Sequence, residues 1–566
     1  MKTKILLAGA ALACMFAAAP AAAKPADWRG CDGFRAPTRT ADGMQRRAQP
    51  MFTQMLDIIG ASIGRRVDSG FAAAGLAACE GALADPLLLP TYTLRRASLL
   101  RARGIYRLAA GEHEAALADF ALSDQAAAPV GDLYYDRSLG LGTALMRSYA
   151  HHLAGRKDEA VAGARAVIAA RPTDPELSAA AADIILAATG DWDVYTATLR
   201  GIAAYDPTVL MSLYPIAAVR GRFEEAAAIQ PQIVLTVPSQ RGGNLVGGRS
   251  PIVVGNFLTQ IELDGSAAFA LAATGQKARA EAGLRALADR VEADLTRPEL
   301  PPGVTDRSTI RRELNRFEQL SPRAEEARTR VAFWRTLVDL RLMAAHGRAA
   351  EAATRVRTER IGQGIYALNI YEAVAAAHPA SRAELEPLIA AARQAVDQSL
   401  ARIAETDLSE LGRRLPEAEL ATRVPAYEGG SDGILGNDGF MSRAASIPGA
   451  RTVKFQSDEG TAATNAEMAL LRAAELARER NMAGFIILDR RVLQRTLVTR
   501  QYGAVIDTDH EGYIAELDVV FVNPDALPAG LEGAGWRFVD AEAVRSRLDP
   551  VYRRRPAAPA NRRNRT

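Results

Sequence analysis

Four short motifs contain nucleophilic, phosphate-binding or metal-binding residue types at spacings that known sites use, and two of them are serine motifs. The stretches 60–64 and 429–433 both read Gly-x-Ser-x-Gly, with Ser62 and Ser431 in the nucleophile position. In serine hydrolases this turn leads from an inner strand of a sheet into a helix. Too little chain precedes the first stretch to build such a sheet, and no apolar strand precedes the second. We therefore predict no catalytic residue at either serine.

The third motif has the glycine spacing of a phosphate-binding loop. It runs from Gly243 to Gly248 and continues with Arg249 and Ser250, so that Arg stands in place of the lysine that such loops require. Pro251 and the β-branched residues after it favour a strand where the loop needs a helix N-terminus. We expect no helix at this point and no nucleotide cofactor.

The fourth motif resembles a calcium-binding loop. Asp507, Asp509, Gly512 and Ile514 match its first, third, sixth and eighth positions, but Asp518 replaces the bidentate glutamate at the twelfth. The flanking residues alternate like strands, whereas a calcium loop of this type lies between two helices. The sequence therefore predicts a β-hairpin turn here and no metal site.

The histidines do not suggest a metal site either. None of them shows the paired spacing that zinc ligands on a helix or in a finger use. Two are adjacent on a predicted helix and so point to different faces. We accordingly predict no metal and no catalytic residue among the six: His113, His151, His152, His346, His378 and His510.

The charge of the chain excludes nucleic acid as a partner. The formal net charge is +3, but two lysines lie in the first 23 residues and six arginines lie after Pro550, with no acid in either piece. Residues 24–550 therefore carry 61 basic and 66 acidic side chains, a net charge of −5. Proteins that bind nucleic acid present a basic surface instead.

The first residues predict export. Lys2 and Lys4 precede an apolar run, and the small residues Ala21 and Ala23 fit the −3 and −1 positions of a cleavage site. Residues 1–23 are thus a predicted signal peptide, and the mature protein is expected in the periplasm or outside the cell. A lipid anchor on Cys14 is the weaker alternative. No later stretch reaches the roughly 18 apolar residues of a transmembrane segment.

Two cysteines remain after cleavage, Cys31 and Cys79. An even count in an oxidising compartment favours a disulfide. We predict that they form a bridge, which would tie an extended N-terminal segment, residues 24–50, to the helical part that follows.

A recurring unit begins near residue 90. Each copy has a helix, a glycine, and five residues later a small or aromatic residue on a second helix. We interpret the glycine as a left-handed helix end and the small residue as a close contact between the two helices. Glycines 155, 190 and 221 are 35 and 31 residues apart, close to the period of roughly 34 residues of helix-turn-helix repeats. The pairs are Gly111/Ala116, Gly155/Ala160, Gly190/Tyr195, Gly221/Ala226, Gly275/Ala280 and Gly347/Ala352.

This pattern resembles the tetratricopeptide repeat family over roughly residues 50–360. The resemblance implies a mainly α fold, a right-handed α-solenoid of helical hairpins over residues 51–411, and a concave surface for a protein or peptide. Irregular helical hairpins are the alternative. A β-like insertion at residues 231–264 interrupts the repeats, and we name Arg241, Asn244 and Arg249 as its candidate binding residues, because insertions in such arrays are often on the binding face.

The character of the chain changes after a Gly-rich linker at residues 412–449. Residues 450–550 predict a small α+β domain, followed by a disordered Arg-rich tail at 551–566. The domain resembles small domains of bacterial envelope lipoproteins, chiefly through the helix from Glu467 to Leu476. Its predicted elements are a strand at 451–455, a helix opened by a capping box of Thr464 and Glu467, a strand at 485–488 and a hairpin formed by 501–507 and 513–522.

Taken together, the motifs favour a non-enzymatic exported scaffold that binds another envelope protein through its helical repeats. The alternative is an envelope enzyme with a site in the C-terminal domain or the Gly-rich loop. No cofactor is predicted, and the sequence leaves the oligomeric state open.

Overall fold

The chain is mainly helical and ends in a small antiparallel sheet. Its computed structural model describes residues 25–37, 44, 69–235, 251–298, 307–359, 361–427, 439–501 and 504–553. The chain divides into two compact units. Unit 1 comprises residues 1–163 and 408–413, and unit 2 comprises residues 164–407 and 414–566.

Unit 1 is built from short helices that pack in sequence order, α3 on α4, α4 on α5 and α5 on α7. A disulfide joins Cys31 on α1 to Cys79 on α3 with a Cα–Cα distance of 4.6 Å, which confirms the predicted bridge. The N-terminal segment is not extended as predicted, because residues 25–32 form α1 and pack on α3. The elements are α1 (Pro25–Asp32), α3 (Ser69–Ala84), α4 (Thr93–Ala109), α5 (His113–Ala127), α6 (Leu133–Tyr135), the π-helical turn η2 (Asp136–Gly140), α7 (Leu141–Leu153), the start of α8 (Lys157–Ala170) and α20 (Leu408–Arg413).

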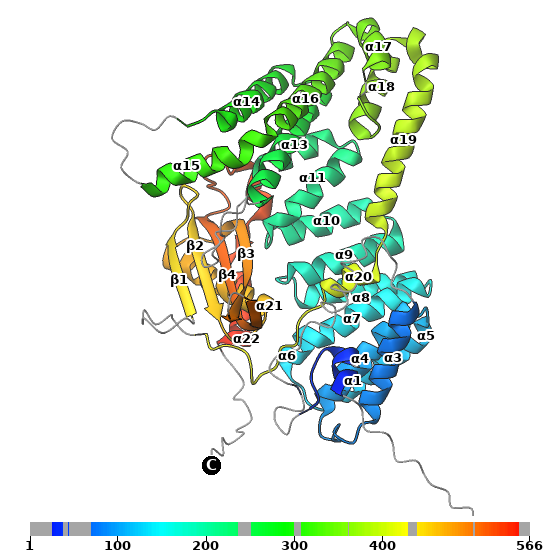
Figure 1. Ribbon diagram of the computed structural model, residues 1–566, viewed down its shortest axis with the longest axis vertical. Coiled ribbons are helices and arrows are strands. Elements are labelled where there is room, and N and C mark those ends of the chain that lie inside the picture. Colours follow the sequence, from blue (N-terminus) through cyan, green and yellow to red (C-terminus); the bar gives the residue numbers. More distant parts are fainter. Residues whose placement is uncertain are drawn as a thin grey trace, which may run out of the picture. The chain divides into compact units, whose positions relative to one another are not determined.

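Unit 2 continues with longer helices. The last of them, α19, packs on α18 and returns to contact α11 and α9 (Figure 1). The helices are α9 (Pro175–Thr189), α10 (Trp192–Ala203), η3 (Pro207–Val209), α11 (Leu210–Val219), α12 (Phe223–Ile229), η4 (Gln230–Gln232), α13 (Pro251–Ala273), α14 (Lys277–Leu295), α15 (Arg307–Leu320), η5 (Ser321–Arg323), α16 (Ala324–Ala345), α17 (Ala349–Thr358), α18 (Ile365–Ala377), η6 (Pro379–Ser381) and α19 (Arg382–Ala404).

The six repeat glycines all adopt the predicted left-handed conformation. Gly190 caps α9 with φ of 68°, and its N–H donates to the carbonyl of Leu186 at 2.7 Å. A side chain at this φ would be strained, so the glycine allows the chain to turn directly into the next helix. The helices on either side of such a turn pack together in the pairs α4–α5, α9–α10, α11–α12, α13–α14 and α16–α17. The other five glycines are Gly111, Gly155, Gly221, Gly275 and Gly347, with φ of 71–80°.

The predicted β-like insertion is wrong where the structure describes it. Residues 252–254 lie in α13, which starts at Pro251, so a helix does follow the Gly-rich stretch. Proline suits the first turn of a helix because it has no N–H to satisfy there. Packing of α13 on α14 and α16 outweighs the β preference of the branched residues. The candidate binding residues Arg241, Asn244 and Arg249 lie outside the described residues.

The C-terminal part of unit 2 is a five-stranded antiparallel sheet with strand order β1-β2-β4-β3-β5. Helix α21 packs on β2, β3 and β4, and α22 packs on α21 (Figure 1). The elements are β1 (Gly439–Ala444), β2 (Arg451–Ser457), α21 (Ala462–Glu479), β3 (Gly484–Gln501), β4 (Ala504–Val522), η7 (Glu532–Arg537), β5 (Val539–Asp540) and α22 (Ala541–Tyr552).

Several local predictions for this part need correction. Strand β1 lies inside the predicted linker 412–449. The N-cap of α21 is Thr461, whose side chain accepts from the N–H of Thr464 at 3.1 Å, so the predicted capping box at Thr464 is wrong. The predicted disordered tail starts too early, because Tyr552 is buried at the end of α22.

The hairpin turn also differs from the prediction. Residues 504–522 form one continuous strand, β4, which pairs with β3 as far as Gln501 and Ala504. The calcium-like motif is therefore strand rather than turn. Asp518 accepts from the hydroxyl of Thr452 at 2.5 Å and from Arg491 at 3.2 Å, which are ordinary contacts within the sheet. None of the helices in the described ranges is long and apolar enough to cross a membrane.

Candidate functional site: a buried polar cluster around Arg171

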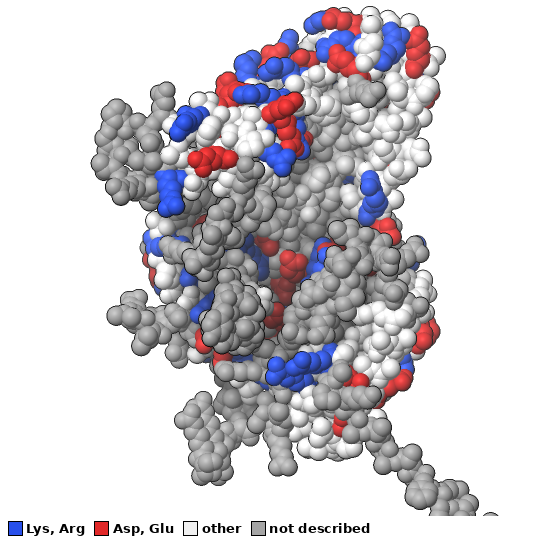
Figure 2. Space-filling view, in the orientation of Figure 1, with Lys and Arg blue, Asp and Glu red and all other residues white. Residues whose placement is uncertain are grey.

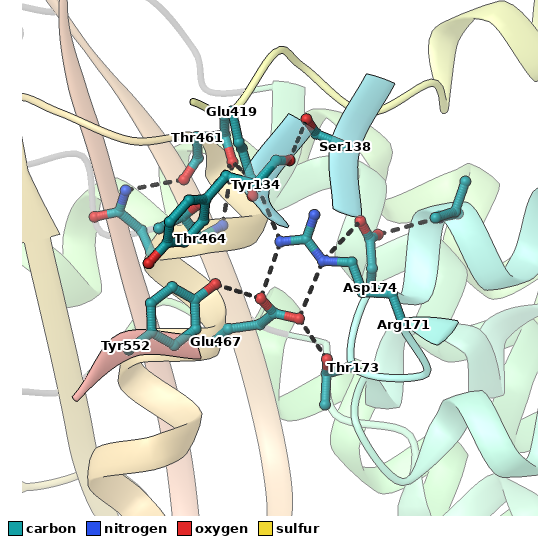
Figure 3. Close-up of polar contacts among 12 residues, drawn as sticks. Tyr134, Ser138, Arg171, Thr173, Asp174, Glu419, Thr461, Thr464, Glu467 and Tyr552 are labelled. Carbon is teal, nitrogen blue, oxygen red and sulfur yellow. Dashed lines mark hydrogen bonds and ion pairs between the residues drawn. The ribbon is translucent and has the colours of Figure 1, made fainter. Parts of the chain in front are cut away.

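Arg171, which lies between α8 and α9, is fully buried in unit 2 and binds several polar side chains. Its Nε and Nη2 donate to the two carboxylate oxygens of Glu467 at 3.1 and 2.9 Å (Figure 3). Nη2 also donates to Glu419 at 3.0 Å. The paired contact with Glu467 matches the planar fork of a guanidinium, and such bidentate pairs are among the strongest polar contacts in proteins.

The turn that presents Arg171 is set by local sequence. Asp174 is the N-cap of α9 and accepts from the N–H of Leu177 at 3.2 Å, while Pro175 occupies the first helical position. The N–H of Asp174 donates to the carbonyl of Arg171 at 3.0 Å and so closes the turn. These local bonds fix the backbone of the turn from which the Arg171 side chain extends.

Glu467 reaches this turn from α21. Besides the two bonds from Arg171, it accepts hydrogen bonds from the hydroxyls of Thr173 and Tyr552 (Figure 3). Tyr552 is the last residue of α22, so this carboxylate joins the end of α22 to α21. Each of the two carboxylate oxygens therefore accepts two hydrogen bonds from buried donors.

Glu419 adds the segment between α20 and β1 to the cluster. It accepts from the hydroxyl of Thr461 at 2.6 Å, and Thr461 is also the N-cap of α21. The guanidinium of Arg171 thus binds one carboxylate from this segment and one from α21. These carboxylates in turn accept hydrogen bonds from Thr461 and from Tyr552 at the end of α22. A buried charge needs such partners, because removing it from water costs several kcal/mol.

The electrostatic balance of the cluster is set by burial and by an excess of acid. Burial alone would lower the pKa of Arg171, but Glu419 and Glu467 hold that pKa well above its usual value. Burial raises the pKa of Asp174, and Arg171, 3.9 Å away, opposes the rise. The arginine is therefore permanently charged, and burial outweighs the effect of Arg171 on the pKa of Asp174.

A second charged group lies on the sheet. Arg491 on β3 forms ion pairs with Asp489 at 2.7 Å and with Asp518 at 3.2 Å, and its Nε lies 3.4 Å from Glu516. Asp489 and Asp518 face each other across β3 and β4. This group pairs neighbouring strands and presents no free nucleophile.

The C-terminal part contacts the helices of unit 2 at further points. Arg490 lies 3.6 Å from Asp206, and the side-chain amide of Gln232 donates to the carbonyl of Gly533 at 3.0 Å. Arg414, which precedes the segment of Glu419, binds Asp183 on α9 at 2.8 Å. Burial lowers the pKa of Arg537 to about 10, and the nearby Asp206 opposes that shift. The sheet and the helices are thus tied together within unit 2.

The contacts described above hold the helices and strands of unit 2 in place. Within the described ranges, no three His, Cys, Asp or Glu side chains are grouped so that they could hold a metal ion. Ser62, Ser431 and the three predicted binding residues fall outside those ranges. The sequence prediction missed Arg171 and Glu419, and it gave Glu467 a local capping role. The only sequence signal was a turn of Arg171 to Pro175 after a helix, which predicts a cap but no partner.

Searches against protein-family profiles, characterised proteins and solved structures found no match to this chain.

Proposed function

We propose that this chain is an exported, non-enzymatic scaffold whose helical repeats bind another protein of the cell envelope. The observation that carries the proposal is that the charged groups of the buried cluster around Arg171 bind one another within the chain. The carboxylate of Glu467 and the guanidinium of Arg171 hold the C-terminal part against the helices, and each of the oxygens of Glu467 already accepts two bonds. Such a cluster stabilises a surface and performs no reaction.

The helical turns support the repeat interpretation. Six left-handed glycines follow six helices, and five of the resulting helix pairs pack directly. This is the local geometry expected for tetratricopeptide-like hairpins, which bury their apolar faces against neighbours and leave an extended surface for a partner. The disulfide between Cys31 and Cys79 supports an oxidising location, and so supports export into the periplasm or beyond.

The visible surface of unit 2 favours a protein partner. Figure 2 shows acidic and basic side chains interspersed at the end of the unit that holds α14 to α17. Ion pairs such as Arg328–Glu292 and Arg316–Asp294, both between different helices, account for part of this mixture. Phe333 on α16 is a large apolar side chain that is 40 % exposed. We propose that the partner contacts this face and residues 241–249.

A photo-cross-linking experiment in intact cells tests this proposal. A photoreactive residue is placed at Asn244 or at Phe333, and the same residue at the exposed Leu87 of unit 1 serves as the matched control. We expect both test positions to capture one and the same envelope protein, and the control position not to capture it. The captured protein should then bind the purified chain, and replacement of residues 241–249 by a Gly-Ser linker should weaken that binding.

Two results would overturn the proposal. One is an identical set of captured proteins from all three positions. The other is unchanged binding after the linker replacement together with the absence of any capture at Phe333. Export is tested separately by N-terminal sequencing, which should find Lys24 as the first residue of the mature chain.

A further inference from the structure

Helix α4 of unit 1 buries two arginines, and only one of them has an acidic partner. Arg95 is fully buried and lies between the rings of Trp28 and Phe34, 5.2 and 5.0 Å from their centroids. Its Nη2 pairs with Asp32 at 2.9 Å. Asp32 also accepts from Ser98 at 2.9 Å, so α4 binds this carboxylate through residues six and three positions before the second arginine.

The second arginine, Arg101, is only 5 % exposed. Its Nε and Nη1 are buried and have no hydrogen-bond acceptor, and no carboxylate of the residues that the structure describes forms an ion pair with it. Burial lowers the pKa of Arg101, and Tyr135 and Asp32 oppose the shift only in part. A guanidinium in this position is strongly unfavourable unless an acceptor occupies the space beside it.

A second unsatisfied donor lies beside it. The hydroxyl of Tyr135, a residue 2 % exposed, interacts electrostatically with Arg101 and has no hydrogen-bond partner of normal geometry. Ser123 lies close to the Tyr135 hydroxyl, and its own hydroxyl donates to the carbonyl of Ala97 at 2.8 Å. Burial raises the pKa of Tyr135 to about 12, so its proton is present at neutral pH and available to a ligand.

The backbone holds Tyr135 in this place by an unusual turn. Asp132 accepts from the N–H groups of Tyr134 and Tyr135 at 2.9 and 3.1 Å, and the π-helical turn η2 follows immediately. The hydroxyl of Ser138 donates to the carbonyl of Tyr134 at 2.7 Å and stabilises that turn. Turns of π-helix are rare and occur frequently at functional sites.

We propose that unit 1 contains a binding site for a small oxyanion, in which the Arg101 guanidinium and the Tyr135 hydroxyl donate to its oxygens. The fully buried charges of the region favour an anionic ligand, because Arg95 and Arg101 face only Asp32. Asp124 and Asp136 also act on Tyr135, but both are open to solvent, and Asp124 pairs with Arg147 at 2.6 Å. The planar N–H groups of a guanidinium fit a carboxylate or a phosphate better than a spherical ion. This site is separate from the proposed protein-binding function and does not depend on it.

The test measures thermal unfolding of the full chain in inorganic phosphate, in acetate and in chloride at constant ionic strength. A ligand that binds only the folded state raises the unfolding midpoint in proportion to the logarithm of its concentration above Kd. We expect a saturating rise of the midpoint in phosphate or in acetate relative to chloride. A rise in phosphate alone assigns a phosphate ligand, and a rise in acetate alone assigns a carboxylate.

Three variants make the result specific. Arg101→Met should abolish the anion-dependent rise, and Tyr135→Phe, which removes one hydroxyl, should reduce it. Arg96→Met is the matched control, because Arg96 lies on the same helix but is partly exposed. It should respond to the anions as the unaltered chain does, which also accounts for general salt effects. If Arg101→Met fails to fold, Tyr135→Phe decides the question alone.

The proposal is overturned if neither anion raises the midpoint, or if Arg101→Met keeps the full rise. A structure determined in saturating phosphate and acetate that shows only water at Arg101 would also overturn it.

Discussion

Arg171 in unit 2 and Arg101 in unit 1 are both buried arginines, but they differ in the number of carboxylates that they contact. Arg171 of unit 2 meets two carboxylates at hydrogen-bond distance and a third nearby, whereas Arg101 of unit 1 meets none among the described residues. The difference shows that burial of a charge does not by itself define its role. A guanidinium whose acceptors all come from its own chain stabilises an arrangement of helices, and one without such acceptors is available to a ligand.

The largest expected effect compares the two arginines directly. Arg171→Met leaves Glu419, Glu467 and Asp174 buried without their cation, and we expect a loss of about 5 kcal/mol in the free energy of unfolding, the upper end for a broken buried pair. Arg101→Met removes an unpaired charge and should leave that free energy unchanged or higher in the absence of added anion. Urea unfolding of both variants measures the difference. Equal losses would show that Arg101 also has a structural partner.

The next effect separates buried from exposed acids on α21. Glu467→Gln removes the charge that pairs with Arg171 but keeps the shape of the side chain, and we expect a loss of about 3 kcal/mol because Glu419 remains. Glu479→Gln is the matched control on the same helix. Its carboxylate is exposed and binds Arg472 at 2.9 Å, so its loss should stay under about 1 kcal/mol. Similar losses for both variants would contradict the docking role of the cluster.

A smaller effect is expected at the C-terminal end of α22. Tyr552→Phe removes one donor to the charged carboxylate of Glu467, which should cost about 2 kcal/mol in urea unfolding. Deletion of residues 554–566, which belong to the Arg-rich tail predicted to be disordered, is the control. We expect that deletion to leave the unfolding midpoint unchanged. A clear drop after the deletion would mean that stability near Tyr552 comes from the tail as well.

The smallest effect is a dependence on pH at Asp174. Because burial raises its pKa in the folded state, the folded chain binds this proton more readily than the unfolded chain. The stability that the protonated group contributes is present below the unfolded pKa of about 3.9 and is lost as the pH rises through the folded pKa. Asp174→Asn, which keeps a capping side chain, should therefore gain on the unaltered chain as the pH rises. Unfolding midpoints between pH 4 and 8 measure this, and a midpoint of Asp174→Asn that falls relative to that of the unaltered chain as the pH rises would contradict it.

Some of this structure could be predicted because local rules decide it. The left-handed φ of Gly190 follows from its position between two helices, and the pairing of Cys31 with Cys79 follows from an even cysteine count after export. The helical class of the first 400 residues and the strands at 451 and 485 follow from apolar periodicity.

The rest depends on contacts that are distant in sequence. Arg171 and Glu467 are separated by 296 residues, and nothing in either neighbourhood indicates the other. The sequence favours a capping box at Thr464 because Glu467 follows it by three residues. The N-cap in the structure is Thr461, which has a threonine and no acid at that position. Pro251 was taken as evidence against a helix, although proline is favoured at a first helical position. In each case tertiary packing or a choice between equivalent local patterns decided the outcome.

The long separation between Arg171 and Glu467 has a consequence for synthesis. A chain made from its N-terminus completes α8 and α9 well before α21 and α22 exist, so the Arg171 guanidinium must stay hydrated until the last helix has formed. Because this contact closes late, unit 2 cannot reach its final packing before α21 and α22 are made. A ribosomal product that stopped before α22 would lack the hydroxyl of Tyr552 and the packing of α22 on α21. The cluster would then open more readily to water and to proteases, so incomplete chains would be removed before they could compete with complete ones.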